Sequence, residues 1–150
     1  MRQPSPHAAR VTAPWRVILL LVGLIDGATG GWALIDPRGW WDSFPGFGHH
    51  LVSGQGGAFN DHLVSDAGAG FLAVGVVLVV GAIIGSPLAV RLAALALLAH
   101  ALPHFLFHVA HSPDHLSRGE KAAGIYSLLA EAIIGAAALV GARPRRRPTL

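Results

Sequence analysis

The chain alternates between long apolar stretches and short polar segments, and four of the apolar stretches are long enough to cross a membrane. They run from about residue 15 to 35, 63 to 84, 88 to 110 and 122 to 142. A helix needs about 20 apolar residues to span the hydrocarbon of a bilayer. The pattern therefore predicts an all-α protein, a four-transmembrane-helix bundle formed by residues 15–142.

The first apolar stretch has one alternative interpretation, which is a cleaved signal peptide. Arginines precede it, and its apolar core at residues 17–25 has the length of a signal sequence. The apolar run continues past Asp26 to full spanning length, however, which favours a retained span.

Composition agrees with a membrane protein. Hydrophobic residues make up 53% of the chain and charged residues 13%, with a mean hydropathy of +0.54. A typical soluble domain is about 25% charged. The chain contains no cysteine, which excludes disulfides, thiolate metal sites and thiol redox chemistry.

The basic residues predict orientation rather than nucleic-acid binding. Four of the eleven lie in the tail at residues 143–150, where we expect them to bind anionic lipid. With both termini inside, the inner side holds Arg2, Arg10, Arg16, Arg91, Arg143, Arg145, Arg146 and Arg147, and the outer side holds Arg38, Arg118 and Lys121. This bias predicts a multi-pass protein of the cell membrane, with a cytoplasmic N-terminal tail at residues 1–14 and a cytoplasmic basic tail.

The long connection at residues 36–61 is then extracytoplasmic. Four of its aromatic residues, Trp40, Trp41, Phe44 and Phe47, are expected to form an interfacial belt, with the loop lying on the membrane surface.

Small residues inside the spans predict close helix packing. The candidates are Gly68, Gly70, Gly75 and Gly81 on the second span and Gly135 on the fourth. Glycine lets neighbouring helix backbones approach each other closely in a membrane.

Polar residues inside the spans are the candidates for chemistry. Asp26 and Glu131 lie near the middle of the first and fourth spans, where a carboxylate costs at least about 2.5–3.5 kcal/mol. Five histidines on or after the third span fall within one narrow stripe if that helix continues past residue 109, namely His100, His104, His108, His111 and His115.

A rise of about 1.5 Å per residue sorts these groups into two layers by depth. The outer layer can hold five residues, which are His62, Asp66, His104, His108 and His111. The inner layer can hold a polar cluster formed by Asp26, His100 and Glu131.

Imidazoles with carboxylates suit a transition metal ion such as Zn, Cu, Fe or Mn, so the outer layer is a candidate metal site. The alternative is a hydrogen-bond network that joins the helices. Haem is the least favoured interpretation, because His62 would have to oppose His104 or His108 across two helices.

The segments FNDHLVSDAGAGFLAVGV and ALPHFLFHVAH resemble a group of small, uncharacterised four-helix integral membrane proteins of high-GC bacteria that are distantly DoxX-like. The resemblance covers residues 36–111. Its motif residues are Asn60, Asp61, His62, Leu63 and Asp66, followed by Pro103, His104 and His108. Ser65 departs from it, because arginine is expected at that position. The resemblance implies the fold and the outer-layer residues, and it implies no activity.

Two function classes remain open. One is a membrane protein with a His/Asp metal-binding or redox site toward the outer leaflet. The other is a non-enzymatic component, such as a proton or metal-ion conductor or a subunit of a homo-oligomer or larger membrane complex. The motifs GxSxG, HExxH, GxxxxGK[ST] and GxGxxG are absent, so nothing indicates a hydrolase or a nucleotide-binding enzyme.

Overall fold

A computed structural model describes residues 10–111 and 113–142 of the chain. Within those ranges the elements are helices and loops, without a β-strand. The helices are α1 (Ala13–Ile35), α2 (Pro37–Ser43), the short 3-10 helix η1 (Ser53–Gln55), α3 (Asp61–Ile84), α4 (Pro87–Ala110) and α5 (Arg118–Gly141). The predicted basic tail and most of the predicted N-terminal tail lie outside the described residues.

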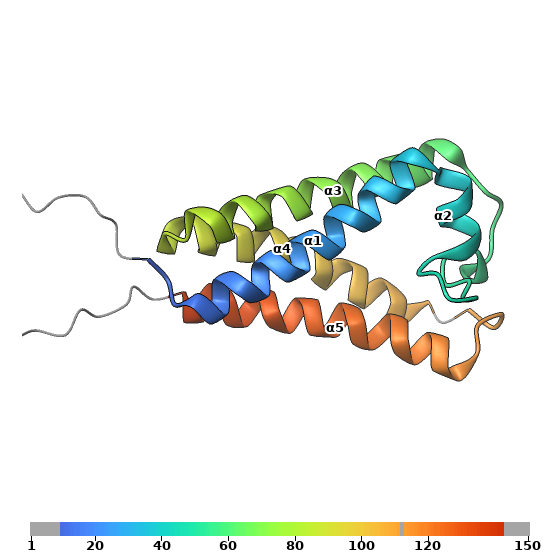
Figure 1. The fold of residues 1–150 in the computed structure, drawn as a ribbon. Coiled ribbons are helices and arrows are strands. Elements are labelled where there is room, and N and C mark those ends of the chain that lie inside the picture. The colour runs from blue at the N-terminus through green and yellow to red at the C-terminus, as the bar shows by residue number, and fades with distance from the viewer. Residues whose placement is uncertain (1–9, 112, 143–150) are drawn as a thin grey trace, which may run out of the picture.

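Four of these helices, α1, α3, α4 and α5, are each long and apolar enough to cross a membrane. Their arrangement as an antiparallel bundle is visible in Figure 1. The prediction of an all-α four-helix bundle is confirmed, and the helices fit a multi-pass integral membrane protein.

Polar side chains cap the first turns of α3 and α5. The Asn60 side chain accepts a hydrogen bond from the Leu63 backbone N–H at the start of α3, at 3.1 Å. Ser117 and Glu120 form a reciprocal capping box at the start of α5, which satisfies backbone donors that the first helical turn leaves free. This box explains why α5 begins at Arg118 rather than near residue 122.

The turn between α3 and α4 depends on the backbone conformation of one glycine. Gly85 follows α3 with a φ of 66°, a left-handed conformation that glycine adopts without steric cost. Ser86 then caps α4 by accepting a hydrogen bond from the Ala89 N–H at 3.2 Å. The Arg16 guanidinium of α1 donates to the last α3 carbonyls, with 2.8 Å between its Nε and the Ala82 oxygen.

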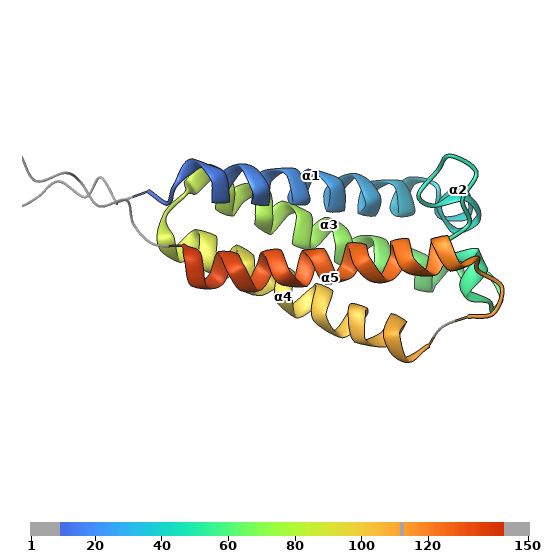
Figure 2. The same ribbon diagram turned by 90° about the horizontal axis from the view of Figure 1, so that it is seen from below.

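The bundle consists of two closely packed pairs. α1 packs most extensively against α3, and α4 packs most extensively against α5, as Figures 1 and 2 both show. The core at the end of the bundle where α1 begins and α5 ends contains fully buried Leu19, Leu78, Val90 and Leu97. Figure 1 places α2 at the opposite end of the bundle from the start of α1 and the end of α5.

Close contact through glycine is confirmed at four of the five predicted positions. A Cβ at Gly68, Gly75, Gly81 or Gly135 would lie within 3.2 Å of atoms on a neighbouring helix. The prediction is wrong for Gly70, where a Cβ would meet nothing within 4 Å. That position faces away from the partner helices, which a count of glycines along the span does not reveal.

Apolar side chains also cover the outside of the bundle. Leu21, Ile83, Leu95 and Val140 are each at least half exposed, and they come from four different helices. In water such a surface would be unstable, whereas hydrocarbon solvates it well.

The aromatic connection differs from the predicted surface belt. Asp36 accepts a hydrogen bond from the Gly39 N–H at 2.9 Å, and Pro37 occupies the first turn, so the segment folds into α2. Trp40 is buried, and its ring lies 5.4 Å from that of Phe44. The segment therefore packs partly inward and covers one end of the bundle, although Phe47 remains fully exposed.

Candidate functional site

The histidine stripe is shorter than predicted. α4 ends at Ala110, so His115 is not part of the helix and His111 is only its C-terminal cap. The His111 ring is exposed and stacks on Phe107 at 4.4 Å. His100, His104 and His108 are the members that share one face of α4.

His104 and His108 lie directly against each other. Their Nε2 atoms are 3.1 Å apart, which is within hydrogen-bonding distance. Spacing of four residues places both on one helix face. His100 lies one turn deeper, with its ring 4.8 Å edge-on from Phe71 of α3.

His62 and Asp66 lie elsewhere. They pair with each other across one turn of α3, with 3.5 Å between Nε2 and Oδ2, and their side chains are 88% and 65% exposed. The predicted outer layer is thus divided between an exposed pair on α3 and a partly buried pair on α4. Across residues 10–111 and 113–142, no three His, Asp or Glu side chains are arranged so that they could hold a metal ion.

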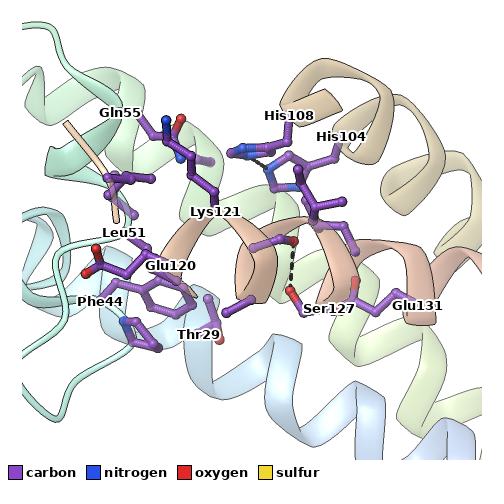
Figure 3. A pocket seen from close by; sticks show the side chains of 18 of the residues that line it. Thr29, Phe44, Leu51, Gln55, His104, His108, Glu120, Lys121, Ser127 and Glu131 are labelled. Carbon is purple, nitrogen blue, oxygen red and sulfur yellow. Dashed lines mark hydrogen bonds between the residues drawn. The ribbon is translucent and has the colours of Figure 1, made fainter. Parts of the chain in front are cut away.

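A cavity of about 460 Å³ lies between the spans on the α2 side of the bundle. All four spans line it, and α2 with its following loop contributes to its outer part. Much of the wall is apolar, including Phe44, Leu51, Phe71 and Leu128. Figure 3 shows its side chains, with His104 and His108 beside each other.

Helical spacing brings the polar groups of the cavity together. On α1, Asp26 and Thr29 are one turn apart, and on α5, Ser127 and Glu131 are one turn apart. His104 and His108 also line the cavity, whereas His62, Asp66 and His100 do not. The structure therefore groups Asp26 and Glu131 with two histidines that depth alone had placed in a different layer.

Several buried polar atoms at this site have no partner. Among the described residues, the buried side-chain atoms without a hydrogen-bond partner are Asp26 Oδ2, Trp40 Nε1, His100 Nε2 and Glu131 Oε2. Three of these residues line the cavity. Asp26 is only 2% exposed. Buried polar groups in folded proteins are nearly always paired, so this concentration makes the cavity the candidate functional site.

The end of the cavity next to α2, called its mouth below, carries the remaining charged groups. Glu120 and Lys121 line it there, and Figure 3 shows Glu120 and Glu131 toward opposite ends of the lining. His49, in the loop after α2, lies with its Nδ1 3.5 Å from Glu120 Oε1. This contact joins the loop to the start of α5 at the mouth.

Sequence reasoning missed Trp40, Thr29 and Ser127 as cavity residues. Trp40 was not predicted to line a cavity because an aromatic residue in a loop next to a span is typical of a membrane interface. Thr29 follows the midspan carboxylate Asp26 by one helical turn, and Ser127 precedes Glu131 by one turn. That spacing was the signal available in the sequence.

Comparison with known proteins gives no further assignment: no family model, curated protein or solved structure matches the chain. The resemblance to DoxX-like four-helix proteins therefore stays a prediction.

Proposed function

We propose that this protein binds a small, mostly apolar molecule in the cavity between its spans. The cavity itself is the observation that supports this function. Its volume of about 460 Å³ lies within the range of about 300–1,000 Å³ that small-molecule sites occupy, and such sites combine an apolar wall with a few polar groups. Asp26 and Glu131 supply those polar groups at the deep end, and each has one buried oxygen that no described residue hydrogen-bonds.

The proposed orientation places the cavity mouth on the extracytoplasmic side of the cell membrane. Arg16 and Arg91 belong to the end of the bundle at which α1 and α4 begin and α5 ends, and the sequence has further arginines before α1 and after α5. An excess of arginine and lysine favours the cytoplasmic side. A ligand would then reach the cavity from outside the cell or from the outer leaflet.

The test of this function uses a neutral photoreactive probe, a ten-carbon alcohol that carries a diazirine. The protein in phosphatidylcholine nanodiscs is labelled with it, and the labelled residues are mapped by mass spectrometry. We expect saturable labelling of cavity-lining peptides of α1 and α5.

Two glycine variants provide the matched comparison. A Cβ at Gly124 or at Gly70 would meet nothing within 4 Å, but only Gly124 lines the cavity. Gly124→Phe should abolish saturable labelling, and Gly70→Phe should leave it intact. Labelling confined to the lipid-facing surfaces of the unmodified protein would contradict the proposal.

A second candidate function, binding of a transition metal ion, is supported by the His104–His108 pair. Two nitrogens bound to one tetrahedral zinc ion at about 2.0–2.1 Å lie roughly 3.3 Å from each other. The observed Nε2–Nε2 separation is 3.1 Å. Both side chains line the cavity, so the remaining ligands would come from a cavity carboxylate, water or the bound molecule.

Titration with Zn²⁺ tests this second candidate. His104→Ala and His108→Ala should each weaken zinc binding by about 10-fold or more, while His62→Ala on the exposed face of α3 should bind as the unmodified protein does. Equal zinc affinity in all of these proteins would refute a metal role for the cavity histidines.

A further inference from the structure

Two carboxylates line the deep end of the cavity. Asp26 comes from α1 and Glu131 from α5, and each has one buried oxygen without a hydrogen-bond partner among the described residues. Neither carboxylate forms an ion pair within the described part of the chain. Asp26 is 2% exposed.

Among the residues that the structure describes, no other charged group lining the cavity is paired with them. Lys121 lines the cavity on the same helix as Glu131, but ten residues of helix separate them by about 15 Å. His104 and His108 direct their Nε2 atoms toward each other. Glu120 is itself anionic and contacts Ser117 and His49 at the mouth.

A buried carboxylate is expensive unless a cation or a set of donors compensates it. Two of them facing one cavity would repel each other if both were ionised. A ligand that carries positive charge removes both penalties at once. An ammonium group supplies a charge and three hydrogen-bond donors, whereas a hydroxyl supplies one donor and no charge.

We propose that the ligand of this cavity is an apolar molecule with a protonated amine, whose ammonium group binds between Asp26 and Glu131. The apolar body of the ligand then packs against the wall that Phe71 and Leu128 provide. This inference rests on the proposed binding function and assigns the chemical class of the ligand.

The experiment compares three photoreactive probes that share the same ten-carbon chain and diazirine and differ only at the end group. One ends in a primary amine, one in an alcohol and one in a carboxylic acid. Each is titrated into the protein in uncharged phosphatidylcholine nanodiscs near neutral pH, and the half-saturating concentration in the membrane is measured for labelling of cavity peptides. The comparison on the unmodified protein requires no variant to fold.

The amine should label at a concentration at least about 10-fold lower than the alcohol, as expected for one hydrogen bond to a charged group. The carboxylic acid should label more weakly than the alcohol. Asp26→Asn and Glu131→Gln should each remove most of the preference for the amine, because an amide keeps the shape of the side chain and loses its charge. Asp61→Asn, an exposed carboxylate outside the cavity, should keep the preference in full.

Equal half-saturating concentrations for the three probes would overturn the amine assignment while leaving the binding function in place. The amine assignment would also be overturned if Asp61→Asn reduced the preference as much as Asp26→Asn does. Failure of all three probes to label the cavity would instead contradict the binding function itself.

Discussion

Replacing Gly30 with alanine should force α1 and α3 apart. A Cβ at this position would lie 2.5 Å from the carbonyl oxygen of Gly68 and closer still to the backbone nitrogen of Leu72. Ordinary carbon–oxygen contacts are about 3.3–3.6 Å, so the two backbones would have to separate locally by roughly 1 Å. No flexible side chain can absorb this shift, because the contacted atoms belong to a backbone.

The magnitude follows from two opposing effects. Overpacking of a tight interface costs about 1–3 kcal/mol, and a gap of about 0.5–1 Å also removes a quarter to a half of each dispersion contact along it. Alanine recovers about 0.5–1 kcal/mol of helix stability relative to glycine. We therefore expect Gly30→Ala to lower the free energy of unfolding by about 1–2 kcal/mol.

Gly31 provides the matched control, since a Cβ there would meet nothing within 4 Å. Gly31→Ala should leave stability unchanged or raise it by up to about 1 kcal/mol. Unfolding in mixed micelles, followed by far-UV circular dichroism, measures both variants. If Gly30→Ala were as stable as Gly31→Ala, the close approach of α1 and α3 would be refuted.

Two further predictions concern the ends of the bundle. Arg16→Ala should lower the free energy of unfolding by about 1.5–3 kcal/mol, because the last carbonyls of α3 lose hydrogen bonds from a charged donor. Replacing the exposed Arg91 with alanine should lower it far less. Equal losses in the two variants would contradict the capping role of Arg16. The chain has no native cysteine, so single cysteine substitutions test its orientation in the membrane directly. Asp114→Cys should react with an impermeant maleimide in intact cells, and Thr12→Cys should react only after permeabilisation. Reaction of both variants in intact cells would contradict the proposed topology.

The spans could be predicted from sequence because length and hydropathy alone define them. A membrane-spanning helix must satisfy its backbone polar groups internally, so a long apolar stretch has few alternatives to a helix. The end of α4 was harder to predict. Spacing allowed the histidine stripe to continue through His115, but the chain leaves the helix after Ala110, just ahead of Pro113.

The composition of the site could be predicted only in part. Depth along each span put Asp26 and Glu131 in one layer and His104 and His108 in another, whereas the cavity includes all four. Depth gives the distance of a residue from the membrane surface, but it does not give the direction in which the residue's helix face points. His62 illustrates the difference, because its depth fits the outer layer while its side chain lies 88% exposed on the outside of α3.

Whether the cavity holds a small molecule is tested most directly by the molecules that accompany the protein out of the membrane. The unmodified protein, Gly124→Phe and Gly70→Phe would each be extracted into nanodiscs and the released compounds quantified by mass spectrometry. We predict that one compound other than the bulk membrane lipids is released in near-stoichiometric amount from the unmodified protein and from Gly70→Phe. Gly124→Phe should release roughly 10-fold less of it. The same content in all three proteins would contradict the proposed binding function.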